Sequence, residues 1–191
     1  MLTTAKHFPG HGDTATDTHL GFAMVNGNQG RLDTVELPPF QKAIDAGVDS
    51  VMIAHVTVPT LDPDQTHVAS TSPKIVTDLL KNKMKFKGLV VTDAIDMNGL
   101  MRLYSQNPGV NPSGAAAAAA VKAGNDMILI PHDLAGAIDG IVKAVRSGEI
   151  PESQIDASVL KILQTKASIG LHKARLVDPE QVGQLVAEPP A

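Results

Sequence analysis

The chain has 191 residues, enough for one domain with a core of its own. Hydrophobic residues make up 43% of the chain and charged residues 19%, which is a globular composition, and with only 3% aromatic residues its core must be aliphatic. The net charge of -4 and the lack of a Lys/Arg block give no electrostatic case for binding nucleic acid or an anionic membrane. The absence of cysteine excludes disulfides, thiolate metal sites and a cysteine nucleophile.

The sequence shows neither a signal peptide nor a membrane-spanning segment. Residues 1–4 lead straight into the motif that begins at Lys6, without the basic and apolar regions of a signal peptide. No uninterrupted apolar segment reaches about 18 residues, so we expect no membrane span. The location stays open, cytoplasmic or periplasmic in the intact protein, and we expect this chain to be part of a longer one.

Short apolar runs alternate with longer amphipathic stretches along the chain. The apolar runs are 2–8, 48–54, 88–92 and 126–130, and the last three are typical of strands buried on both faces. Helical spacing or capping signals mark 37–47, a stretch opening at 72–73, 113–123, 134–147 and 155–169. This alternation predicts an α/β fold with a parallel sheet. A (β/α)₈ TIM barrel needs eight strands and about 250 residues, so four βα units make a partial barrel.

Ionisable side chains follow each predicted strand. Lys6 and His7 close the first run, His55 the second and Asp93 the third, while 132–133 follow the fourth. The carboxyl ends of parallel strands meet at one face of the sheet, where such folds place their sites. We therefore expect these residues to share one site.

Two features of this face suggest particular chemistry. Asp17 and His19 are close enough for a hydrogen bond in a bent loop, which would fix the imidazole tautomer and raise its basicity, although such triplets are common in solvated loops. Asp93 ends an apolar strand, where a carboxylate is costly unless it is used or paired. Retaining glycosidases need such a carboxylate as nucleophile.

Two motifs carry a family resemblance. The segment KHFPGHGDT at 6–14, followed by Asp17-Thr18-His19, resembles the signature of glycoside hydrolase family 3, in its β-N-acetylglucosaminidase (β-N-acetylhexosaminidase) branch. The segment VVTDAIDM at 90–97 resembles that family's nucleophile motif. The resemblance covers residues 1–177 and implies the C-terminal half of the catalytic barrel, with 178–191 as a polar tail.

The resemblance also implies roles for individual residues. Asp93 would be the nucleophile, and His19, oriented by Asp17, the general acid/base. Lys6 and His7 would bind sugar hydroxyls, with His55 near the same subsite, and no metal or cofactor would be required. The substrate would be a carbohydrate with a terminal β-linked N-acetylglucosamine. The leaving group stays open among peptidoglycan muropeptides, chitooligosaccharides and glycoprotein fragments.

Other readings of the same residues remain. A half-barrel leaves two open strand edges, which favours self-association or an inactive, merely assembling fragment. His7 and His11 are four residues apart, which on a helix would suit a zinc ion in a metal-dependent hydrolase, but Pro9 and Gly10 disfavour a helix there. A β-glucosidase is a further alternative, which a histidine acid/base disfavours.

Overall fold

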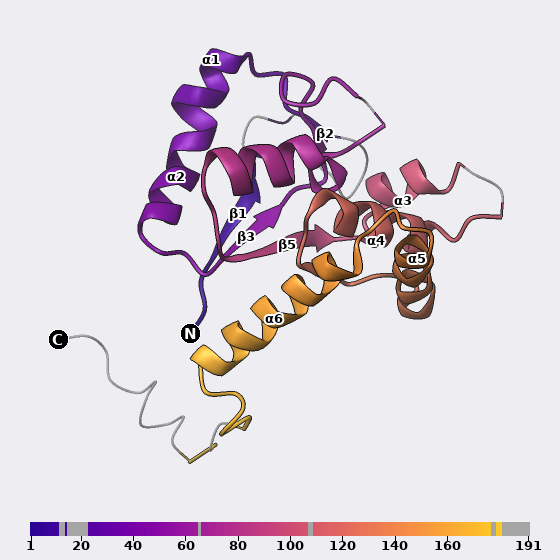
Figure 1. Cartoon of the computed structure of the whole chain (residues 1–191). Helices are drawn as coiled ribbons and strands as arrows, with labels where there is room; N and C mark the ends of the chain where they lie inside the picture. The colour runs from indigo at the N-terminus through magenta and orange to yellow at the C-terminus, as the bar shows by residue number, and fades with distance from the viewer. Residues whose placement is uncertain (12–13, 15–22, 65, 107–108, 177–178, 181–191) are drawn as a thin grey trace.

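The fold is built on a parallel sheet of four strands, seen in a computed structural model that describes residues 1–11, 14, 23–64, 66–106, 109–176 and 179–180. The sheet order is β1-β3-β5-β6, and each strand pairs in parallel with the next (Figure 1). Its strands are β1 (Thr4–Phe8), β3 (Ser50–Ile53), β5 (Leu89–Ala94) and β6 (Met127–Leu129). The predicted α/β class and all four predicted strands are confirmed.

A second, two-stranded parallel pair was not predicted. It joins β2 (Ala23–Met24) to β4 (Val56–Thr57). Each of these strands is only two residues long, too short to show a periodic pattern in the sequence.

Helices cover the sheet and connect its strands. They are α1 (Gln29–Arg31), η1 (Leu32–Glu36), α2 (Leu37–Asp45), η2 (Ala69–Thr71), η3 (Lys74–Lys83), α3 (Asn98–Tyr104), α4 (Pro112–Ala123), α5 (Leu134–Arg146) and α6 (Glu152–Ser168). The five predicted helices correspond to α2, η3, α4, α5 and α6. Within the described residues, no helix combines the length and apolar character needed to cross a membrane.

Helix α4 forms from the alanine run, as predicted, with signals at both ends. The Asn111 side chain accepts a hydrogen bond from the Gly114 amide at 3.0 Å, and Pro112 occupies the first turn. Gly124 ends the helix with a φ of 115°, in the left-handed region that favours glycine. Glycines also bring α4 close to α5, since a Cβ on Gly114 would lie 2.7 Å from the Gly136 carbonyl oxygen. A Cβ on Gly140 would overlap the Gly114 backbone in the same way.

The main core lies between β1, β3 and β5 and the helices α2 and η3. It is aliphatic apart from three phenylalanines, and the rings of Phe8 and Phe40 meet edge to face at 5.1 Å. Ile53 and Leu80 are completely buried in the same cluster. This core fixes β1, β3 and β5 side by side, and so fixes the relative positions of their carboxyl ends.

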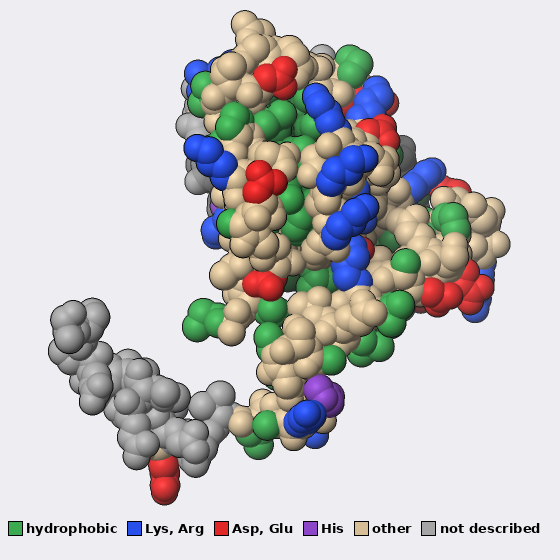
Figure 2. All heavy atoms as spheres, turned by 60° about the vertical axis from the view of Figure 1, so that its left-hand side comes forward, with side chains coloured by type: hydrophobic (Ala, Val, Ile, Leu, Met, Phe, Trp, Pro, Cys, Tyr) green, Lys and Arg blue, Asp and Glu red, His purple; other side chains and the backbone are tan. Residues whose placement is uncertain are grey.

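The edge of the sheet at β6 departs from the prediction. All three residues of β6 are only half-buried, so the expectation that this strand is buried on both faces was wrong. Strand β6 is the last strand of the sheet, and the helices beyond it leave apolar side chains exposed. Exposed apolar residues include Leu134, Ile138 and Val142 on α5 and Val159, Leu160 and Leu163 on α6. Hydrophobic side chains are visible along α6 in the lower part of Figure 2.

Candidate active site

The carboxyl ends of β1 and β5 bring His7 and Asp93 together. The Nε2 atom of His7 lies 3.6 Å from Oδ2 of Asp93, and both side chains remain partly exposed. Burial lowers the pKa of His7 below its usual value, and the nearby Asp93 carboxylate opposes this shift only in part. At neutral pH the site therefore presents a neutral imidazole beside Asp93, with both side chains open to a ligand.

A hollow of about 560 Å³ lies beside His7. Both predicted sugar contacts, Lys6 and His7, line it, together with His11 and, from η1, Glu36. The peptide bond between Lys6 and His7 is cis. Gly10 has a φ of 138°, and a Cβ there would lie 2.8 Å from the Glu36 carboxylate, so the close approach of this loop to η1 requires glycine.

Asp93 sits at an irregularity of its strand. The pairing of β5 with β6 shifts register between Val91 and Ala94, and the Leu129 amide donates to Thr92 Oγ1 at 3.1 Å. The Ala94 amide donates to Oδ1 of Asp93 at 2.9 Å. Irregularities of this kind commonly re-aim a side chain next to an active site. The other carboxylate oxygen, Oδ2, is the one nearer to His7.

His55 follows β3, between the two strands that carry His7 and Asp93. It is almost completely buried, with Nδ1 at 2.7 Å from Ser70 Oγ and Nε2 at 3.0 Å from the Ala94 carbonyl oxygen. Burial lowers its pKa, against the attraction of the Asp93 charge. The structure thus places His55 beside the Asp93 backbone, and its role as a sugar contact stays a prediction.

The predicted acid/base pair cannot be placed. Asp17 and His19, like Asp13, lie outside the described residues. His11, named in the metal alternative, lies with its ring 5.9 Å from that of His7, and its Nδ1 is 2.9 Å from Thr14 Oγ1. Where the chain is described, no three His, Cys, Asp or Glu side chains are grouped so that they could hold a metal ion.

Some residues at the strand ends have structural roles. Asp133 caps α5, because its carboxylate accepts from the Gly136 amide at 2.9 Å and from Asn111 Nδ2 at 2.7 Å. The sequence did not single out Ser70, which holds the His55 ring, or Thr92, whose hydroxyl accepts from the Leu129 amide next to Asp93. Their signal is a small hydroxyl side chain within an apolar segment, which is too common to single out a site.

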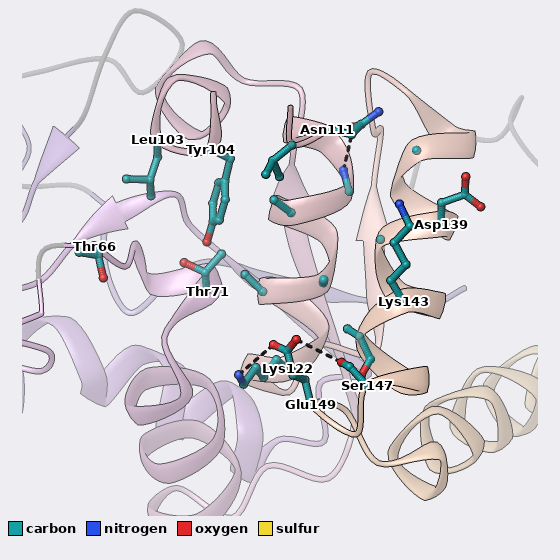
Figure 3. Close-up of a pocket in the computed structure, with 18 of the residues that line it drawn as sticks. Thr66, Thr71, Leu103, Tyr104, Asn111, Lys122, Asp139, Lys143, Ser147 and Glu149 are labelled. Carbon is teal, nitrogen blue, oxygen red and sulfur yellow. Dashed lines mark hydrogen bonds and ion pairs between the residues drawn. The ribbon is translucent and has the colours of Figure 1, made fainter. Parts of the chain in front are cut away.

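A larger hollow, of about 1120 Å³, lies elsewhere, between α3, α4 and α5 (Figure 3). The Tyr104 hydroxyl points toward Thr71 at one side, and Lys143 and Asp139 of α5 stand at the other. Burial raises the pKa of Tyr104, although its hydrogen bond with Thr71 opposes the shift. Of the predicted site residues that the structure describes, none lines this hollow. It lies in the helical layer, so we assign the site to the strand ends.

Comparison with known proteins identifies the family. Residues 1–165 match the glycosyl hydrolase family 3 N terminal domain, so the chain belongs to glycoside hydrolase family 3. The family resemblance and the partial TIM-barrel fold predicted from the sequence are confirmed.

Several relatives with a solved structure or a name are similar to this chain. A glycoside hydrolase family 3 β-N-acetylglucosaminidase from Paenibacillus is 38% identical, with a TM-score of 0.84 over 93% of this chain and 33% of its own. The beta-hexosaminidase of Stenotrophomonas maltophilia is 38% identical over 69% of this chain and 36% of its own length. The Cellulomonas fimi β-N-acetylglucosaminidase/β-glucosidase is 30% identical over 99% of this chain and 34% of its own. The chain thus spans about a third of each of these relatives.

Proposed function

We propose that this chain carries the nucleophile of a retaining β-N-acetylhexosaminidase, with Asp93 as that nucleophile. The observation that carries the proposal is the approach of His7 Nε2 to Asp93 Oδ2 at 3.6 Å. It joins the two sequence motifs that are far apart in the chain, at the carboxyl ends of β1 and β5. A partly exposed carboxylate lies beside a neutral imidazole, and that imidazole also borders a hollow lined by Lys6. This arrangement suits a sugar ring held against a nucleophile.

The chemistry would run in two steps. A carboxylate oxygen of Asp93 attacks the anomeric carbon, and the bond to the leaving oxygen breaks as that oxygen takes a proton from His19. Neutral His19, oriented by Asp17, then removes a proton from a water molecule that attacks the same carbon. The bond to Asp93 breaks, and the sugar leaves with its anomeric configuration retained. Lys6 and His7 would bind ring hydroxyls throughout.

The proposed glycone is β-linked N-acetylglucosamine. The names of the Paenibacillus and Stenotrophomonas relatives support it. A β-glucoside is the second candidate, supported by the double name of the Cellulomonas fimi relative and by a β-glucoside phosphorylase that is 25% identical with a TM-score of 0.83. Rates on the p-nitrophenyl β-glycosides of the two sugars would separate them.

The experiment is hydrolysis of p-nitrophenyl N-acetyl-β-glucosaminide by the 191-residue chain, beside Asp93→Ala and the matched variant Asp96→Ala. Turnover lost only with Asp93, and insensitive to a chelator, supports the proposal. Turnover lost on chelation would favour the metal-dependent alternative. A folded chain without turnover would mean that the motifs are present but that the isolated chain does not complete the site.

We also propose that the isolated chain self-associates through its open edges. Strands β1 and β6 stand at the two edges of the sheet, and Leu134, Ile138 and Val142 expose an apolar stripe on α5 at a spacing of four residues. Two copies related by a two-fold axis could each cover the other's open edges. Size-exclusion chromatography with light scattering tests this, with Ile138→Glu expected to weaken the assembly. A wild-type chain that stays monomeric would contradict it.

A further inference from the structure

His55 is held on both sides of its ring by protein atoms. Its side chain is 3% exposed, Nδ1 lies 2.7 Å from the Ser70 hydroxyl, and Nε2 lies 3.0 Å from the Ala94 carbonyl oxygen. Both ring nitrogens are therefore engaged within the protein. A sugar hydroxyl could reach this ring only by displacing one of these partners.

The two partners fix the proton on the ring. A carbonyl oxygen can only accept a hydrogen bond, so Nε2 must carry the hydrogen that it donates to Ala94. Nδ1 is then the unprotonated nitrogen and accepts from the Ser70 hydroxyl. The burial of His55, which lowers its pKa, keeps this tautomer neutral.

The Ala94 carbonyl, which His55 holds, lies outside the regular pairing of β3 with β5. The pairing of β3 with β5 runs to Ile53 and Thr92, and Ala94 lies beyond it. On the other side of the same peptide group, the Ile95 amide donates to the Leu129 carbonyl at 2.9 Å. The peptide between Ala94 and Ile95 is thus fixed at its oxygen by His55 and at its nitrogen by β6. A buried peptide group needs such partners.

Ser70 is itself fixed, so it can hold the ring. Its amide donates to the Ala54 carbonyl at 3.1 Å, and its carbonyl accepts from Asn125 Nδ2 at 2.7 Å. Asn125 is 1% exposed and also donates to the Ala120 carbonyl at 2.7 Å. The chain of contacts therefore runs from the end of α4 through Ser70 and His55 to the end of β5.

This chain of contacts ends at the carboxylate. The Ala94 amide donates to Asp93 Oδ1 at 2.9 Å, so the orientation of the Ala94 backbone sets the orientation of the Asp93 side chain. The other oxygen, Oδ2, is the one that lies 3.6 Å from His7. Ala94 joins the carbonyl that His55 holds to the amide that Asp93 accepts, so a change in the Ala94 backbone would turn the carboxylate away from His7.

We propose that His55 is a positioning residue for Asp93, a neutral imidazole protonated at Nε2 that holds the Ala94 carbonyl and so aims the carboxylate. It acts through the backbone and does not contact the sugar. Its catalytic consequence rests on the proposed function, in which Asp93 is the nucleophile. A misplacement of about 1 Å can lower a rate about 100-fold without removing any reacting group.

The first test uses the full chain and needs no turnover. Long-range ¹H–¹⁵N NMR of the His55 ring should show hydrogen on Nε2 and none on Nδ1 between pH 6 and 8. In His55→Asn, which is too short to reach Ala94, the Asp93 carboxyl carbon and the Ala94 amide should shift. In His55→Gln, whose amide nitrogen can replace Nε2, both signals should return close to their wild-type positions. A hydrogen on Nδ1, or an Asp93 carboxyl signal unchanged in folded His55→Asn, would overturn the proposal.

The second test separates positioning from stability. We expect His55→Asn to lower kcat about 100-fold with KM within about twofold, and His55→Gln to recover most of kcat. Leu80→Ala, a cavity in the main core on η3, should lower Tm without changing kcat or the Asp93 signal. A KM effect as large as the kcat effect would restore His55 as a sugar contact and refute the proposal. If the folded wild-type chain has no turnover, the isolated chain does not complete the site of the proposed function, and the NMR result alone decides the role of His55.

Discussion

Asp93 and Asp133 both follow strands of the same parallel sheet, yet the structure uses them differently. The Asp133 carboxylate accepts hydrogen bonds from the Gly136 amide and from the Asn111 side chain. These bonds cap the start of α5 and join it to the start of α4. Asp93 accepts from the neighbouring Ala94 amide, and its other carboxylate oxygen faces His7. Sequence position at a strand end therefore marks a candidate, and the hydrogen bonds separate a capping carboxylate from one that can react.

The largest expected effect is that of Asp93→Asn on hydrolysis. Replacing a nucleophilic carboxylate with an amide should lower kcat by about 10⁴-fold or more, with little change in Tm, because the side chain contributes few hydrogen bonds. The matched variant Asp133→Asn keeps a capping side chain and should leave kcat within about twofold. Initial rates on p-nitrophenyl N-acetyl-β-glucosaminide measure both. Equal losses in the two variants would remove the distinction between the two aspartates.

A third aspartate, at the amino end of β6, sharpens the comparison. The Asp126 carboxylate is buried and accepts from Lys161 Nζ at 2.7 Å, Ser158 Oγ at 3.0 Å and the Val90 amide at 2.9 Å, with Lys81 Nζ at 3.7 Å. Asp126→Ala leaves two half-buried lysines without their partner, so we expect a loss of about 3 kcal/mol in the free energy of unfolding. Urea denaturation measures it.

The double variant Asp126→Leu with Lys161→Met is the control for Asp126→Ala. It removes both the Asp126 charge and the charge of its partner Lys161, and it should therefore restore part of the lost stability. If Asp126→Ala costs less than about 1 kcal/mol, the contacts of Asp126 do not hold α6 to the sheet.

Acid should weaken the fold through the two histidines beside Asp93. The pKa values of His7 and His55 are lowered in the folded chain, so the unfolded chain binds protons more strongly. Their contribution is complete above the unfolded pKa of about 6.5 and is lost as pH falls below it, by up to about 1.4 kcal/mol per pH unit for buried His55. Unfolding free energies between pH 7.5 and 5 measure this slope, which His55→Gln should reduce. A slope unchanged in that variant would show that His55 is not held neutral.

The smallest effect belongs to the capping aspartate. Asp133→Ala removes the acceptor for the Gly136 amide at the start of α5, and we expect Tm to fall by about 3 °C with kcat unchanged. Asp139→Ala, further along the same helix, is the comparison and should change Tm less. Thermal denaturation followed by circular dichroism measures both. A loss of activity in Asp133→Ala would place this residue in the site.

The sequence predicted the parts of the fold that depend on periodicity. The four strands and five main helices follow from apolar spacing and from signals such as Gly124, and the family motifs placed Lys6, His7 and Asp93 at strand ends. Strands β2 and β4 and helix α3 are too short to carry a period. The partial burial of β6 depends on what lies beyond the last strand, which the spacing within that strand does not encode.

The candidate site was predicted less completely than the fold. The proximity of His7 and Asp93 followed from the rule for parallel strands. The orientation of His55 did not, because the same residue at a strand end can face a ligand or turn into the protein. Its direction depends on Ser70 and on the register shift at Ala94, and both are tertiary features.

The close approach of Gly114 and Gly140 limits which residues can replace glycine at these two positions. A methyl group on Gly140 would overlap the Gly114 backbone, and one on Gly114 would meet the Gly136 carbonyl oxygen, so either would push α4 and α5 apart. Because these contacts are with backbone atoms, a side chain at either position is disfavoured whatever residue stands at the other. Gly140→Ala would therefore be a way to spread the two helices that line the hollow in Figure 3.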